Sequence, residues 1–184
     1  MKIKKFLISF IIFFISTNIL LAKDRNQELN KLFDELKKNN PNSSFEIEQR
    51  IWKIWSTHPN NDKFTDLLAE GSKFINNQNF LKAEKIFTNL INLDPNWAEA
   101  WNKRATVLYL MGNYELSQKD IDMVLSLEKR HFGALSGQGL VQIALKNYEK
   151  ALDSYIEAHK IYPSMKSTLK MMEKLRVLIQ QESI

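Results

Sequence analysis

Apolar residues recur at helical spacing along most of this chain. One stripe consists of Leu29, Leu32, Phe33 and Leu36, and another of Ala83, Ile86, Phe87 and Leu90. Apolar positions spaced by three and four residues lie on one face of an amphipathic helix. The chain has only 5 Gly and 4 Pro among 184 residues, which leaves few breaks for a many-stranded sheet. The pattern therefore predicts an all-α protein.

The sequence also repeats itself at a spacing of 34 residues. Small residues, bulky residues and asparagines each return at that interval. A fixed period of this length is typical of stacked supersecondary units. The aligned sets are Gly71, Ala105 and Gly139; Ala83, Ser117 and Ala151; Leu67, Trp101 and Leu135; Phe80, Tyr114 and Tyr148; Phe87, Ile121 and Tyr155; and Asn79, Asn113 and Asn147.

Each of these columns has a physical reason. The small residues let the two helices of a hairpin cross closely, and the bulky ones fill the space between hairpins. Asparagine before an aromatic residue suits a tight turn, since it tolerates the left-handed conformation that ends a helix. Pro95 and Pro163 push Asp94 and Tyr162 out of helical geometry, so each second helix should end there.

These columns resemble the tetratricopeptide repeat (TPR) family. Three units match it, 64–97, 98–131 and 132–165, and the stretch 98–114 is near the family consensus. The departures are Lys129 in place of proline, Gln142 in place of a large residue, and Glu70 where an apolar residue is common. The resemblance implies a right-handed superhelical solenoid of three helical hairpins, with a concave face built mainly by the first helix of each unit.

Helices are also expected on both sides of the repeats. Residues 23–59 predict a helical pair, broken at 39–42, whose second helix starts at a capping box of Ser43 with Glu46 and ends near His58. This pair is similar to the Ile-Trp-x-x-Trp segment of some exported proteobacterial family members. Residues 166–184 predict a capping helix, with Met165, Leu169, Met172, Leu175 and Ile179 on its apolar face. Glu173 falls in a small-residue column, where a charge excludes a close helix crossing.

Residues 1–22 predict a secretory signal peptide. Three lysines precede the apolar run 6–15, and Ala22 supplies a small residue before Lys23, where we expect cleavage. Removal of this segment leaves 23 Lys and Arg against 21 Asp and Glu, about +2 instead of +5, which argues against a nucleic-acid partner. We therefore expect a periplasmic protein. The alternative is a membrane-tethered assembly factor that keeps residues 1–22 as an anchor.

No catalytic, metal or cofactor site is expected. The chain has no cysteine, and no histidine follows another at metal-ligand spacing. We expect His58, His131 and His159 to be structural and mostly exposed, and Asp120 and Asp122 to be solvated surface. Trp52, Trp55, Trp97 and Trp101 are interpreted as core or inter-helix packing residues rather than a binding box. The sequence thus favours a protein-binding module over an enzyme.

The resemblance places the partner site in the concave groove. By register, the groove residues are Leu68, Ser72, Ile75, Asn102, Thr106, Tyr109, Ser136, Leu140 and Ile143. Family members that clamp a C-terminal carboxylate use Lys, Arg and Asn; this chain has Leu68, Ser72, Lys103, Gly133 and Gly137 at those offsets. The expected partner is instead an extended or helical protein segment, bound by an adaptor or scaffold of the cell envelope. The alternative is that the N-terminal helices fill the groove.

Overall fold

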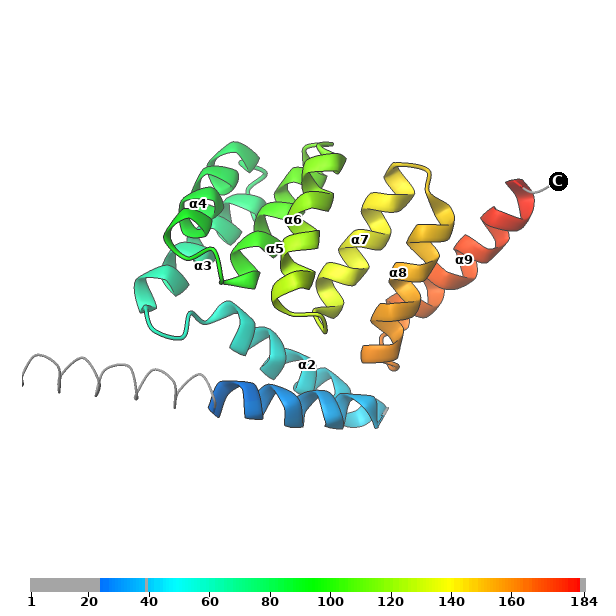
Figure 1. The fold of residues 1–184 in the computed structure, drawn as a ribbon, viewed down its shortest axis with the longest axis horizontal. Helices are drawn as coiled ribbons and strands as arrows, with labels where there is room; N and C mark the ends of the chain where they lie inside the picture. Colours follow the sequence, from blue (N-terminus) through cyan, green and yellow to red (C-terminus); the bar gives the residue numbers. More distant parts are fainter. Residues whose placement is uncertain (1–23, 39, 183–184) are drawn as a thin grey trace, which may run out of the picture.

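In the computed structural model, residues 24–38 and 40–182 are described, and all their regular structure is helical (Figure 1). The prediction of an all-α fold is confirmed. The expected signal peptide and its cleavage site at Ala22 and Lys23 lie outside the described residues. The helices are 24–37, α2 (Pro41–Ser56), α3 (Asp62–Asn76), α4 (Phe80–Leu93), α5 (Ala98–Leu110), α6 (Tyr114–Leu127), α7 (Phe132–Ala144), α8 (Tyr148–Ile161) and α9 (Lys166–Glu182).

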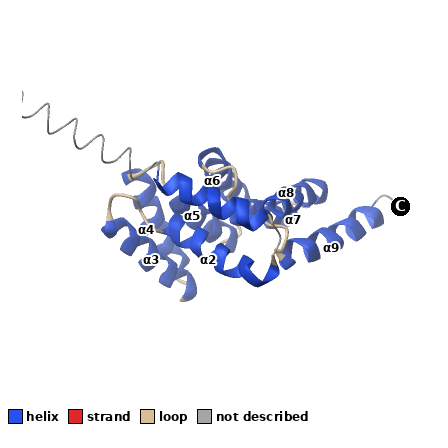
Figure 2. Ribbon diagram, turned by 90° about the horizontal axis from the view of Figure 1, so that it is seen from below, coloured by secondary structure: helices blue, strands red, loops and turns tan. Residues whose placement is uncertain are grey.

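Three helical hairpins form the stack. Helix α3 pairs with α4, α5 with α6 and α7 with α8, and each hairpin packs on the next, while α9 packs on α8 (Figure 1). The helix at 24–37 and α2 lie together along one edge of the stack (Figures 1 and 2). Within the described residues, no helix is long and apolar enough to span a membrane.

The small-residue columns lie where the helices of a hairpin cross. A Cβ atom added to Gly139 would lie 2.5 Å from Cε2 of Tyr155, and one added to Gly71 would lie 2.5 Å from Cε1 of Phe87. Ala83 and Ala151, on the facing helices, have no exposed surface. The predicted close crossing is therefore confirmed at both hairpins, because a larger side chain would collide with an aromatic ring.

The turn inside each hairpin differs from the prediction. The left-handed residue is the one before asparagine: Gln78 (φ 56°), Gly112 (φ 78°) or Lys146 (φ 61°). The asparagines Asn79, Asn113 and Asn147 have negative φ and occupy the N-cap of the second helix. Asn79 accepts a hydrogen bond from the Lys82 backbone N–H. The asparagine column thus starts a helix rather than ending one.

The joints between hairpins are extended at Asp94 and Tyr162, as predicted from the prolines that follow. Glu128 has the same conformation, with φ −142°, although Lys129 follows it. Each of these three residues donates its backbone N–H to the carbonyl four residues earlier. The second joint therefore takes the extended conformation without a proline after it.

The N-terminal pair has a different helix start from the one predicted. Helix α2 begins at Pro41, and the Asn40 side chain caps it by accepting from the Asn42 N–H at 3.1 Å. The expected start at Ser43 with Glu46 is therefore wrong: proline suits the first helical position, because its missing N–H would have no partner there.

The capping helix α9 buries Thr168, Met172 and Leu175. Glu173 is exposed, as its position in the small-residue column required. Leu169, predicted on the apolar face, is instead 47% exposed.

Candidate protein-binding groove

A small pocket of about 80 Å³ lies between α5 and α7, with α6 behind it, on the side that the family resemblance makes the concave face. Ala105, Gly133, Ala134 and Gly137 contribute little side-chain bulk, which leaves space between the two helices. Every side chain that lines the pocket is uncharged. The full lining is Asn102, Ala105, Thr106, Tyr109, Ser117, Ile121, Gly133, Ala134, Gly137 and Leu140.

Four of the predicted groove residues line this pocket: Asn102, Thr106, Tyr109 and Leu140. Leu140 is 40% exposed, and Thr106 is exposed while its hydroxyl donates to the Asn102 carbonyl at 3.0 Å. Tyr109 is half-buried, with its ring centroid 5.6 Å from that of Tyr114. The pocket therefore offers an apolar side chain, an aromatic ring and polar groups to one bound segment.

The other predicted groove residues lie elsewhere. Leu68 is 2% exposed and belongs to the core of the first hairpin, so it has no surface for a partner. Ile75 and Ile143 are half-buried against the first and last core clusters. Ser72 returns its hydroxyl to the Leu68 carbonyl, and Ser136 lies 4.0 Å from the Met165 sulfur. The residues brought together are thus those of α5 and α7.

Helix α2 closes the edge of the stack beside this pocket. It lies against all three joints, where Trp97, His131 and Met165 follow one another at the repeat spacing. The Trp97 indole donates to the Trp55 carbonyl at 2.9 Å, and the Trp55 ring stacks on His131 with centroids 3.9 Å apart. We call these contacts of α2 with the three joints the joint surface.

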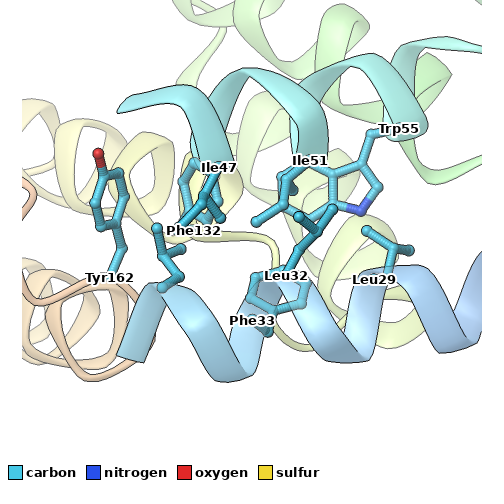
Figure 3. Packing of buried hydrophobic residues seen from close by; sticks show 9 residues of the cluster. Leu29, Leu32, Phe33, Ile47, Ile51, Trp55, Phe132 and Tyr162 are labelled. Carbon is cyan, nitrogen blue, oxygen red and sulfur yellow. The ribbon is translucent and has the colours of Figure 1, made fainter. Parts of the chain in front are cut away.

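The joint surface has a continuous apolar core. Residues of the 24–37 helix, of α2 and of the later joints form one buried cluster (Figure 3). Its members are Leu29, Leu32, Phe33, Leu36, Ile47, Ile51, Trp55, Phe132 and Tyr162. At its far end the Tyr162 hydroxyl lies 3.1 Å from the Glu48 carboxylate, to which it donates.

A buried acid–histidine pair lies beneath this core. His131 and Glu99 have fully buried side chains. His131 Nδ1 accepts from the Ala134 backbone N–H at 3.0 Å, so it serves as the N-cap of α7. Because Nδ1 is an acceptor, the ring proton of neutral histidine lies on Nε2, which donates to Glu99 Oε2 at 3.1 Å. The pair ties α5 to the start of α7.

Lys103 balances the charge of Glu99. Its Nζ lies 3.2 Å from Glu99 Oε1 and 5.9 Å from the ring centroid of Trp52. Burial alone raises the pKa of Glu99, but the His131 hydrogen bond and the Lys103 charge outweigh it, so the pKa lies below its ordinary value of 4.5. Lys103, the cation at a carboxylate-clamp offset, is therefore already engaged inside the chain.

A second histidine ties α2 to the first joint. His58 is 7% exposed; its Nε2 lies 2.9 Å from Asp94 Oδ2, and its Nδ1 accepts from the Asn60 N–H. Its ring lies edge-on to Trp97 at 5.0 Å. The expectation that His58 and His131 are exposed is wrong, because the N-terminal pair covers both joints.

The prediction for Asp120 is wrong, whereas the prediction for two of the tryptophans is confirmed. Asp120 is 4% exposed and takes two hydrogen bonds from the Arg104 guanidinium, at 2.7 and 2.8 Å, so it is not solvated surface. The packing role of the tryptophans is confirmed for Trp55 and Trp97, both 5% exposed. Among the described residues, no three His, Asp or Glu side chains gather as metal ligands would.

The joint surface was missed because it mixes repeat and non-repeat residues. One signal was present: the position of Trp97 is repeated as His131 and Met165, three residues with side chains too large for an open turn. Glu99 at a groove position, four residues before Lys103, was a second. Both signals indicate that another part of the chain buries these residues, and in the structure that part is α2.

Comparison with known proteins defines the class. The chain is 36% identical over 137 residues to a TPR repeat-containing protein of Rhizobium etli, a match that covers 70% of this chain and 67% of that protein. The chain belongs to the tetratricopeptide repeat family. No family model matches it.

Solved structures share the fold at low sequence identity. The first TPR domain of Spaghetti (RPAP3), bound to an HSP90 peptide, has a TM-score of 0.62 and 18% identity, over 65% of this chain and 94% of that one. The Yersinia enterocolitica secretion chaperone SycD, in complex with a peptide of the translocator YopD, has a TM-score of 0.60 and 13% identity, over 64% and 95%. The chain thus has the fold of a TPR domain.

Proposed function

We propose that this protein is an exported adaptor of the cell envelope, which binds a segment of a partner protein in the concave pocket between α5 and α7. The observation that carries the proposal is the contrast in that pocket: Leu140 and Thr106 are exposed beside a small-residue floor. The peptide complexes of Spaghetti and SycD support it by likeness of fold.

The lining favours an uncharged anchor in the bound segment. An apolar side chain fits between Tyr109 and Leu140, and the exposed Thr106 hydroxyl supplies a polar atom for a peptide backbone. Asn102 is buried, and its amide donates to Glu99 Oε2 at 3.0 Å. A C-terminal carboxylate finds no free cation at the clamp offsets, because Lys103 pairs with Glu99. The proposed partner therefore presents an internal segment.

Site-specific photo-crosslinking in the cell tests the pocket. A photoreactive amino acid at Thr106 should capture one discrete partner, whereas the same group at Leu81, 72% exposed on α4, should capture none or a different set. Identical crosslinked products from both positions would show that the pocket is not the binding site.

The N-terminus decides between the adaptor and the tethered assembly factor. We expect the crosslinked chain in the periplasmic fraction, with a mature N-terminus at Lys23, because the charged start, apolar run and Ala22 occur in that order. An intact mass that retains residues 1–22, recovered with the membrane, would instead favour the anchor.

A further inference from the structure

Trp52 of α2 lies beside the joint end of the pocket. Gly133, the first residue of α7 that lines the pocket, packs directly against its indole: a Cβ atom added to Gly133 would lie 2.5 Å from Cη2 of Trp52. On the α5 side, Lys103 Nζ lies 5.9 Å from the Trp52 ring centroid, and Lys103 follows Asn102, the first residue of α5 that lines the pocket. The indole therefore reaches both helices that form the pocket.

The Trp52 ring is fixed in place but not fully covered. It packs edge-on against Trp55 and Phe132, with centroids 5.3 and 5.5 Å away, and its N–H donates to Glu48 Oε1 at 3.3 Å. Trp55 is 5% exposed, whereas Trp52 is only partly buried. Tryptophan is among the side chains that carry most of the binding energy in protein interfaces. A held indole with open surface next to the pocket is therefore suited to contact a ligand.

Gly133 is matched to this tryptophan. Glycine is less favourable than alanine in a helix, and Gly133 does not have the positive φ that would require it. The close approach of Trp52 is the feature that leaves no room for a side chain there. A residue of the repeat and a residue from outside the repeats thus fit each other, and this fit brings the indole to the end of the pocket.

We propose that Trp52 is part of the partner-binding site: its indole closes the joint end of the pocket, and a large apolar side chain of the partner segment packs on it beside the anchor. This inference rests on the proposed function of the pocket. In an extended segment, side chains on the same side lie about 7 Å apart, so the residue two positions from the anchor meets the indole. Helix α2 stays docked, and only the open part of the Trp52 side chain meets the segment.

Photo-crosslinking at a second position tests the proposal. A photoreactive phenylalanine derivative in place of Trp52 should capture the same partner as the group at Thr106, whereas the derivative in place of Phe45, 69% exposed on the same helix, should not. If Thr106 captures a partner and position 52 does not, the inference is overturned and the pocket remains the binding site. If Thr106 captures nothing, the proposed function fails and the inference fails with it.

The partner segment captured at Thr106, made as a peptide, gives a measurement on natural side chains. Trp52→Ala should weaken its binding about tenfold, and Phe45→Ala by less than about twofold. Trp52→Phe keeps an aromatic ring on α2 and hence the fold, and it should weaken binding about threefold because the smaller ring covers less of the segment. Parent affinity in Trp52→Phe and Trp52→Ala would overturn the inference.

The packing of the indole on Gly133 has its own test. Gly133→Ala should lower the urea midpoint of the parent, because the added Cβ collides with Trp52. In the Trp52→Ala background the same change should leave the midpoint unchanged or raise it, since alanine stabilises a helix relative to glycine. An equal loss in both backgrounds would mean that Trp52 does not pack on Gly133, and it would overturn the inference.

Discussion

The joint surface and the concave pocket are built from the same helices, yet one is closed and the other is open. At the joints, α5 and α7 present Trp97, His131 and Phe132, and α2 buries all three. Between two and three turns further along the same helices, Thr106 and Leu140 remain exposed. The difference teaches that in a repeat protein an added element, rather than the repeat itself, decides which face is left for a ligand.

The two surfaces also use charge differently. The joint surface buries a carboxylate, and hence needs Lys103 and His131 to stabilise its charge. The pocket has no charged lining and needs no such partners. Substitutions at the joints should therefore change stability, and substitutions in the pocket should change binding.

The largest effect is expected at the centre of the joint surface. Trp55→Ala should lower the free energy of unfolding by about 3–5 kcal/mol, because it empties a buried aromatic site against His131 and Phe132. Urea unfolding measures it. Phe45→Ala on the same helix, 69% exposed, should change stability by less than about 0.5 kcal/mol. Equal small losses would mean that α2 does not dock on the joints.

Inside a hairpin, Gly139→Leu should destabilise the stack by about 1–3 kcal/mol or more, since even a Cβ there meets Tyr155 at 2.5 Å. Ala83→Leu should destabilise the first hairpin similarly, because the Ala83 side chain has no exposed surface. Glu173→Leu, in the Gly139 column but exposed on α9, is the control and should have little effect. If thermal unfolding shows the same loss of stability for Glu173→Leu as for the other two variants, the 34-residue repeat register is wrong.

Glu99→Gln tests the buried charge, with an expected loss of about 1–2 kcal/mol at neutral pH. The pKa of Glu99 is lowered in the folded chain, so its contribution is complete above the unfolded value of about 4.5 and is lost as pH falls below it. The gap between parent and variant should therefore narrow in acid. Unfolding curves at neutral pH and below pH ~4.5 measure this. A gap that widens in acid would contradict the charge assignment.

The smallest effect on stability is expected in the pocket. Tyr109→Ala should cost less than about 1 kcal/mol in unfolding, because the ring is only half-buried. It should weaken binding of the partner segment that is captured by crosslinking at Thr106 by about 2 kcal/mol, or some thirtyfold. Fluorescence anisotropy and melting of the same variant separate the two. If the variant unfolds, Tyr109 belongs to the core instead.

Most of the hairpin architecture could be predicted because its causes are local. Gly139 packs closely against Tyr155, and both residues lie in one repeat, so the 34-residue period is enough to predict this helix crossing. The conformations of Gln78 and Lys146 were missed by one position, because nothing in a side chain of either residue marks a left-handed turn.

The candidate site could be predicted only in part. The repeat register predicts the helix face on which a residue lies, but it does not predict whether another part of the chain buries that residue. Thr106, Tyr109 and Leu140 line the pocket as expected, since α5 and α7 repeat each other. Leu68 follows the same register, but it is buried in the first hairpin. Burial of His131 depends on Trp55, a contact across 76 positions that the 34-residue period does not encode.

Hydrogen–deuterium exchange with and without the partner segment captured by crosslinking at Thr106 tests the central claim most directly. We expect slower exchange in α5 and α7 and unchanged exchange in α2, because the ligand enters the open pocket and leaves the joint surface closed. Faster exchange in α2, together with protection at the joints around Trp97 and His131, would mean that the partner replaces α2. That result would contradict the assignment of the working face.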